Sequence, residues 1–183
     1  MSGIFVAVVG ASGVGKDSLI GFARERLVDD VSVVRRVVTR PPDGDSEDHV
    51  SLTPDAFAAA DQAGHFALSW QAHGLQYGLP ITLEADLAAG RLVIANLSRA
   101  ALPRLLARYP TALVVEVTAV PEIIAQRLTS RGREAEEEIR RRMNRSVDHP
   151  LPPSSIRIDN SGDLAVAGTR FTALLRDLLR QSA

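Results

Sequence analysis

The feature that most constrains this chain is a glycine-rich segment near its N-terminus. Residues 10–16 read G-A-S-G-V-G-K and fill the first seven places of the P-loop pattern G-x-x-x-x-G-K-[ST]. Residues 4–9 before it form an apolar, β-branched run typical of a strand buried on both faces. Residues 17–27 after it carry an apolar stripe typical of an amphipathic helix. This order predicts a phosphate-binding loop instead of an ordinary strand-to-helix turn, because backbone N–H groups and a helix N-terminus converge on anions.

The lysine of the pattern is Lys16, the only lysine among the 21 basic residues. It is expected to supply a positive charge to the β- and γ-phosphates of a nucleotide. Asp17 stands where the pattern has a magnesium-binding hydroxyl, and Ser18 follows it. A carboxylate can bind Mg²⁺, although an acidic residue in a first helical turn also complements the helix dipole. The residues expected to bind nucleotide here are Gly10, Ala11, Ser12, Gly13, Val14, Gly15, Lys16, Asp17 and Ser18, with Asp17 as the metal ligand.

Composition excludes several other classes of protein. The chain has 183 residues, 45% of them hydrophobic, which fits one globular domain. It has no cysteine, which excludes a disulfide framework, a thiolate zinc site and a cysteine nucleophile. The net charge of -1 does not favour nucleic acid as a partner, and no apolar run approaches the ~20 residues of a membrane span. We therefore expect a cytoplasmic protein with small-molecule partners, and leave a homodimer open.

The rest of the chain alternates apolar strands with amphipathic helices. Strands are expected over 31–38, 92–95, 112–117 and 156–158, and helices over 100–108, 121–130 and 163–180. This alternation predicts an α/β fold with a parallel sheet core flanked by helices. Residues 40–90 break the alternation with a polar loop, short strands and two helices. The first of these helices begins at Thr53-Pro54, and the second ends before Gly90. We expect one domain over 1–183, with a core of 1–39 and 91–183 and an inserted lobe over about 40–90.

Several short elements resemble guanylate kinases. Thr39-Arg40 follows the second expected strand, Gly64-His65-Phe66 matches a G-x-F strand, and Tyr77-Gly78 ends a G-x-x-Y-G element. The resemblance covers nearly the whole chain, including an arginine-rich segment at about 131–145 in the place of a lid, and Asn160 after the last strand. It implies a P-loop kinase whose second substrate binds by its phosphate in the inserted lobe.

The chain departs from guanylate kinases at the positions that read the acceptor. Asp43 replaces a second phosphate-binding arginine and His49 replaces a tyrosine. Leu68 stands in the place of the glutamate that binds guanine, and 96–99 read N-L-S-R where a D-x-D element is expected. A site that binds guanine needs these carboxylates, because the N–H groups of the ring are otherwise unpaired. The lobe therefore keeps phosphate recognition and loses base recognition.

This combination is similar to the ribose 1,5-bisphosphate phosphokinases of phosphonate utilisation. The matching elements, in chain order, are Gly15-Lys16-Asp17-Ser18, Thr39-Arg40, Leu68-Ser69-Trp70, residues 73–78, residues 96–100 and Arg131-Gly132-Arg133-Glu134. The similarity also accounts for the aspartate after Lys16. It implies transfer of the γ-phosphoryl group of ATP, with Mg²⁺, to the 1-phosphate of the sugar, which gives 5-phosphoribosyl 1-diphosphate.

The resemblance also implies roles for individual residues. Those implied in catalysis are Lys16, Arg40, Arg99 and Arg131. Those implied in acceptor binding are Arg40, His49, His73, Tyr77, Asn96 and Arg99. Those implied around ATP, beyond the P-loop, are Arg127, Arg133, Arg142 and Asn160. The charged run over 131–145 also fits a solvated helix with i,i+4 ion pairs.

Two other functions remain alternatives. One is a guanylate-like nucleoside monophosphate kinase, which predicts base-reading carboxylates that the lobe lacks. The other is a non-catalytic guanylate-kinase-like binding module. Such modules typically lose the P-loop, whereas Gly10, Gly15 and Lys16 are present here.

Overall fold

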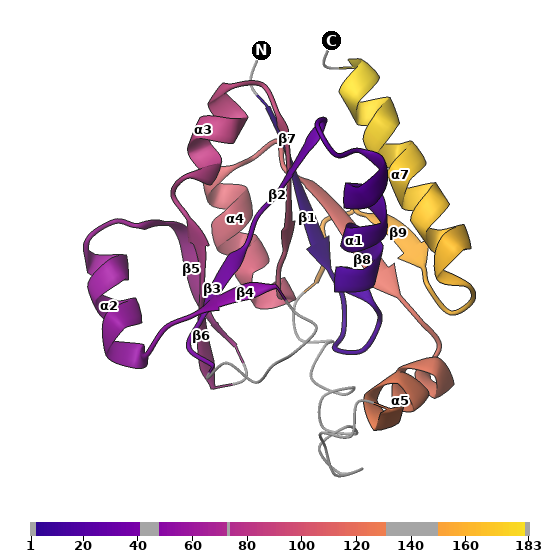
Figure 1. Ribbon diagram of the computed structural model, residues 1–183, viewed down its shortest axis with the longest axis horizontal. Coiled ribbons are helices and arrows are strands. Elements are labelled where there is room, and N and C mark those ends of the chain that lie inside the picture. Colours follow the sequence, from indigo (N-terminus) through magenta and orange to yellow (C-terminus); the bar gives the residue numbers. More distant parts are fainter. Residues whose placement is uncertain (1–2, 41–47, 73, 131–149, 182–183) are drawn as a thin grey trace.

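The structure is a computed structural model that describes residues 3–40, 48–72, 74–130 and 150–181. Its elements (Figure 1) are β1 (Ile4–Val9), α1 (Lys16–Arg26), β2 (Val31–Val33), β3 (Arg36–Val38), β4 (His49–Ser51), α2 (Pro54–Gln62), β5 (Phe66–Ala72), β6 (Leu75–Pro80), α3 (Leu83–Ala88), β7 (Leu92–Asn96), the 3₁₀ helix η1 (Arg99–Ala101), α4 (Leu102–Arg108), β8 (Leu113–Thr118), α5 (Pro121–Ser130), β9 (Ile156–Asp159) and α7 (Leu164–Gln181). Asp43, His73, Arg131, Arg133, Arg142 and the segment 131–145 lie outside the described residues.

The core of the molecule is a five-stranded parallel sheet in the order β2-β7-β1-β8-β9. Helices α1 and α7 cover one face, and α3 and α4 cover the other (Figure 1). The expected α/β fold with a parallel sheet core is confirmed. Because the strands are parallel, the carboxyl ends of β1, β7 and β8 lie at one edge of the sheet. Functional side chains that follow these strands are brought to that edge.

Side chains of β1 alternate between two apolar clusters on opposite faces of the sheet. Val6 and Val8 pack with residues of α1 and α7, including Phe171. Phe5 and Ala7 pack on the other face with α3, α4 and residues of β5 and β6, including Trp70. Burying a large apolar side chain contributes roughly 1.5–3 kcal/mol. The second cluster therefore joins the core sheet firmly to the strands that follow it.

A second, four-stranded sheet has the order β4-β3-β6-β5, with β3 and β4 parallel and the other pairs antiparallel. The single strand expected over 31–38 is wrong, because β2 pairs with β7 in the core sheet and β3 belongs to this second sheet. The backbone N–H of Val34 donates to the carbonyl of Ile94 at 2.8 Å, and the chain then leaves the core sheet. The strand β4 was not expected. Apolar patterns predict strands but do not identify their partners.

Local signals mark the helix boundaries as expected. The hydroxyl of Thr53 accepts a hydrogen bond from the backbone N–H of Ala56 at 3.2 Å and caps α2. Helix α3 ends before Gly90, whose φ of 79° places it in the left-handed region. Helix α7 follows Asp163, whose carboxylate accepts from the backbone N–H of Ala165 at 2.8 Å. None of the helices in the described part of the chain has the length and apolar character needed to cross a bilayer.

Two glycines in the packed pair α1 and α7 give a matched test of this packing. A Cβ at Gly168 in α7 would come within 2.4 Å of the ring of Phe22, whereas a Cβ at Gly21 in α1 would meet nothing within 4 Å. We expect Gly168→Ala to lower the free energy of unfolding by about 1–3 kcal/mol through overpacking. We expect Gly21→Ala to raise it by about 0.5–1 kcal/mol, since alanine favours the helix. Urea unfolding of both variants measures this, and equal stabilisation by both would show that the ring moves aside without cost.

Candidate active site

The P-loop connects β1 to α1 at the carboxyl edge of the core sheet. Gly13 and Gly15 have φ angles of 85° and 87°, in the left-handed region that favours glycine. Gly15 occupies the N-cap position of α1 and gives the helix no side-chain capping hydrogen bond. Backbone N–H groups of the first turn therefore remain available to an anion, as a phosphate-binding loop requires.

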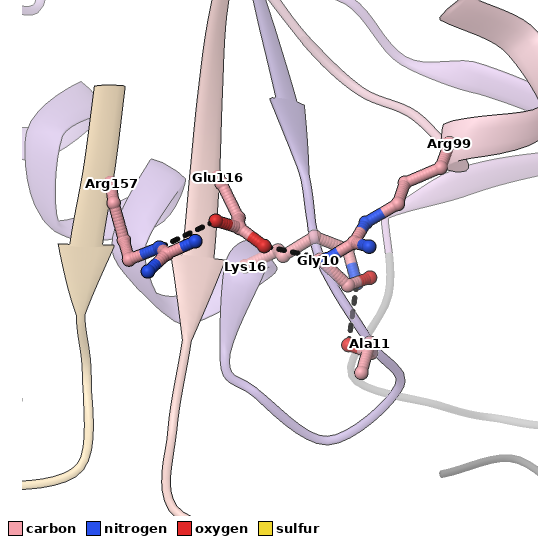
Figure 2. Close-up of polar contacts among 6 residues, drawn as sticks. All are labelled: Gly10, Ala11, Lys16, Arg99, Glu116 and Arg157. Carbon is pink, nitrogen blue, oxygen red and sulfur yellow. Dashed lines mark hydrogen bonds and ion pairs between the residues drawn. The ribbon is translucent and has the colours of Figure 1, made fainter. Parts of the chain in front are cut away.

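Lys16 folds back over the loop that precedes it. Its Nζ donates to the carbonyl of Gly10 at 2.9 Å and to the carbonyl of Ala11 at 3.0 Å (Figure 2). These contacts hold the ammonium group above the loop at the end of β1. A role of this ammonium group toward the β- and γ-phosphates remains a prediction from the loop pattern.

The carbonyl of Val14 in the P-loop is hydrogen-bonded by residues from distant parts of the chain. The carbonyl of Val14 accepts hydrogen bonds from Asn160 Nδ2 at 2.7 Å and from Arg127 Nη1 at 3.2 Å. Asn160 is buried, and a Cβ at Gly15 would lie only 2.5 Å from its Nδ2. The two residues that the resemblance assigns to ATP binding outside the loop and the lid are therefore in direct contact with the loop.

Asp17 and Asn96 meet where α1 faces the end of β7. Asn96 Nδ2 donates to Asp17 Oδ1 at 2.6 Å. Asn96 is 7% exposed, and its buried Oδ1 has no hydrogen-bond partner among the described residues. A pocket of about 220 Å³ opens beside this pair, between α1 and the segment that joins β2 to β3. The amide nitrogen of Asn96 thus faces the carboxylate of Asp17, and the Oδ1 of Asn96 is a buried acceptor that no described residue uses.

This oxygen pair fits a magnesium ion bound together with nucleotide. Carboxylate and amide oxygens are hard ligands, and Mg²⁺ next to phosphates usually takes only one or two protein ligands. The described parts of the chain contain no cluster of three or more His, Cys, Asp or Glu residues able to hold a metal without a nucleotide. The fit to Mg²⁺ therefore rests on the oxygens of Asp17 and Asn96.

Arg40, His49 and Tyr77 lie in or next to strands of the second sheet, with His49 at the start of β4 and Arg40 beyond the end of β3. Arg40 follows β3, and the preceding Thr39 is fixed by a hydrogen bond from the backbone N–H of Gln76 to its Oγ1 at 2.9 Å. Tyr77 in β6 pairs with Val38 and stacks on Trp70 with ring centroids 5.3 Å apart. His49 begins β4, opposite Arg36 of β3. Tyr77 therefore lies near the end of β3 that Arg40 follows, whereas His49 lies beside the start of β3.

One position expected to read a base is apolar and buried. Leu68 is 7% exposed and packs in the cluster that joins this sheet to α4. Trp70 is 5% exposed and belongs to the same cluster. These side chains give the N–H groups of a guanine ring no acceptor.

Arg99 makes a contact that sequence analysis missed. Its Nη2 donates to Glu116 Oε1 at 2.5 Å, and Arg157 Nε donates to the other oxygen of Glu116 at 2.7 Å (Figure 2). Glu116 lies in β8 and is 5% exposed. The signal in the sequence is a single acidic residue inside the apolar strand L-V-V-E-V-T.

Comparison with known proteins decides the family. No family model matches the chain. A ribose 1,5-bisphosphate phosphokinase PhnN from Burkholderia mallei is 47% identical over 178 residues, which cover 96% of each chain. The protein of the same name from Pseudofrankia inefficax is 46% identical over 175 residues, covering 96% of this chain and 92% of that one. This chain belongs to the PhnN family of ribose 1,5-bisphosphate phosphokinases.

Two solved kinase structures share the fold of this PhnN family member. A guanylate kinase from Anaplasma phagocytophilum has a TM-score of 0.69 at 14% identity, with 97% of this chain and 87% of that chain covered. A gluconokinase from Sinorhizobium meliloti has a TM-score of 0.56 at 16% identity, with coverages of 97% and 94%. At such identities the likeness concerns the fold alone. Guanylate kinase is therefore a fold relative.

Proposed function

We propose that this protein transfers the γ-phosphoryl group of ATP to the 1-phosphate of ribose 1,5-bisphosphate, giving 5-phosphoribosyl 1-diphosphate and ADP. The observation that carries the proposal is 47% identity to a protein named for this activity, over 96% of both chains. The site supports it independently. It combines a P-loop with Tyr77 in the second sheet and Arg40 after β3, and it buries Leu68 where a base would be read.

Lys16 and the first turn of α1 bind the transferred phosphate. Lys16 Nζ exchanges the carbonyls of Gly10 and Ala11 for phosphate oxygens, so the cation is already close to the place where it is needed. Asp17, oriented by Asn96, and the Oδ1 of Asn96 would hold Mg²⁺ or its bound water. Mg²⁺ would there neutralise the negative charge of the phosphates.

The acceptor needs placement more than activation. Its attacking atom is an oxygen of the sugar 1-phosphate, which is already ionised, so no strong general base is required. A new P–O bond forms between that oxygen and the γ-phosphorus as the bond from the γ-phosphorus to the β,γ-bridging oxygen breaks. Arg40 and Tyr77 bind the acceptor phosphate from the second sheet, with Arg40 as a bidentate guanidinium. Arg99 begins η1, which packs against β5, and binds the acceptor phosphate from the core.

The remaining assignments follow the family resemblance. His49 and His73 contact the acceptor, and Arg131, Arg133 and Arg142 close over ATP from a lid at about 131–145. Arg127 and Asn160 support the ATP side through Val14. The acceptor lobe extends over about 40–90, and the core comprises 1–39 and 91–183. The enzyme acts on small molecules in the cytoplasm.

The proposal is tested by the product as well as by ADP. Purified protein is incubated with MgATP and ribose 1,5-bisphosphate, and ADP is measured against a control without acceptor. A phosphoribosyltransferase and its base are then added, and formation of the nucleotide is followed. We expect acceptor-dependent ADP and a product that the transferase consumes. ADP without a consumable product would contradict phosphorylation at the 1-phosphate.

The metal assignment gives a separate prediction for Asp17→Asn. The amide keeps an oxygen for Asn96 Nδ2 but removes the charge that attracts Mg²⁺. We expect the Mg²⁺ concentration for half-maximal activity to rise several-fold, with the fold unchanged. Glu25→Gln, which neutralises an exposed acid in the same helix, is the matched control and should leave the titration unchanged. Identical Mg²⁺ titrations for Asp17→Asn and wild type would favour a role in complementing the helix dipole.

A further inference from the structure

Glu116 is a buried carboxylate that the proposed reaction does not use. It lies in β8 between Val115 and Val117, and the residue is 5% exposed. Taking a carboxylate out of water is costly unless it is paired, and a well-packed apolar residue is often as stable in such a place. Stability alone therefore does not explain why this strand contains a buried charge.

The contacts of Glu116 point to the active site. Glu116 pairs in register with Val9, the last residue before the P-loop glycine Gly10. Arg99 reaches it from η1, so the guanidinium of Arg99 crosses the end of β1 beside the loop (Figure 2). Among the described residues, Glu116 is the only hydrogen-bond partner of the Arg99 side chain. The direction of this long side chain therefore depends on one carboxylate oxygen.

Arg157 of β9 also binds Glu116, on the side opposite Arg99. It pairs with Glu116 across β8 and β9 and binds the second carboxylate oxygen at 2.7 Å. Its side chain is 72% exposed, whereas that of Arg99 is 22% exposed. Two guanidinium groups share one carboxylate, so the cluster keeps an excess of positive charge at the edge where phosphates are expected. Glu116 can therefore orient Arg99 without cancelling its attraction for a phosphate.

We propose that Glu116 is a positioning residue that holds Arg99 in the orientation in which it binds the acceptor phosphate. The inference rests on the proposed function, which gives Arg99 that role. Arg99 uses one of its five N–H donors for the hydrogen bond to Glu116, so other donors remain for phosphate oxygens. A guanidinium fixed before the acceptor arrives loses less freedom when it binds.

A double-mutant cycle of Glu116→Gln and Arg99→Ala tests the proposal. We expect each single variant to raise KM for ribose 1,5-bisphosphate about tenfold, with KM for ATP changed less than about twofold. The double variant should have the same KM for ribose 1,5-bisphosphate as Arg99→Ala, because Glu116 then has no arginine to orient. Arg157→Gln removes the other cation from the same carboxylate and is the matched control, with an acceptor KM within about twofold of wild type.

Different outcomes overturn different statements. Additive losses in the double variant, or a parallel rise in KM for ATP, would show that Glu116 acts through the structure in general. If Glu116→Gln does not fold, Glu116→Asp keeps the charge but withdraws it from Arg99, and it should raise the acceptor KM in the same way. Wild-type kinetics in Arg99→Ala would overturn the positioning role alone. Wild-type enzyme inactive with ribose 1,5-bisphosphate but active with GMP would overturn the proposed function, and the cycle is then measured with GMP.

Discussion

Lys16→Ala should lower kcat by about 10²-fold or more, the largest effect of any single substitution considered. The ammonium group meets negative charge that shifts as the γ-phosphoryl group moves, so its removal acts on the transition state more than on ATP binding. We therefore expect KM for ATP to change less than kcat. Steady-state kinetics with the acceptor at saturation measure both constants.

The control for Lys16→Ala must separate catalysis from folding. Lys16 also binds the carbonyls of Gly10 and Ala11, so its loss relaxes the loop. The thermal unfolding midpoint of the variant should lie close to that of wild type, because Lys16 is not part of either apolar cluster. Arg176→Ala, which removes an exposed cation from α7, should keep wild-type kinetics. Wild-type turnover in Lys16→Ala would contradict the P-loop assignment.

GMP should be a poor acceptor, by on the order of 10²-fold or more in kcat/KM relative to ribose 1,5-bisphosphate. Placing a guanine edge against Leu68 leaves N–H donors unpaired, at a cost of about 1–3 kcal/mol for each group. A sugar bisphosphate has no such edge and brings a second phosphate for the basic residues. Phosphate recognition through Arg40 and Tyr77 does not offset the loss, because both acceptors carry a phosphate.

A panel of acceptors measures this selectivity. ADP formation is followed with MgATP and, in separate reactions, ribose 1,5-bisphosphate, GMP, AMP or gluconate at the same concentrations. We expect only the first to support rapid turnover. Comparable or faster turnover with GMP would replace the present assignment with a guanylate kinase, whose fold this chain shares.

The fold was largely predictable because its signals are local. Residues 4–9 are apolar and the glycines that follow allow the left-handed turns of the loop, so strand and loop could be located without any tertiary information. Thr53 and Gly90 marked helix ends for the same reason. The division of 31–38 between two sheets was not predictable. Each half is apolar enough for a strand, and only the positions of β7 and β6 decide the partners.

Candidate site residues could be named from the sequence where residue type alone limits the chemistry. Lys16 and Asp17 follow from the loop pattern, and Arg40 follows from the resemblance. The contact of Asn96 with Asp17 and that of Glu116 with Arg99 depend on which strands are neighbours. A glutamate in an apolar strand gives a visible signal, yet the sequence does not name the two arginines that share it. Such pairings require the sheet order, which no local pattern contains.

The contact between Asn160 and Val14 has a consequence for the order in which the enzyme becomes competent. It joins residues 146 positions apart, so the P-loop gains this support only after β9 has docked at the edge of the sheet. Contacts between such distant residues form late, because closing long loops costs entropy before any contact compensates. A ribosome-bound chain that ends before residue 156 contains the entire loop sequence but lacks the amide that braces it. Nucleotide affinity should therefore develop near the end of folding, and nucleotide binding can serve as a reporter that the last strand is in place.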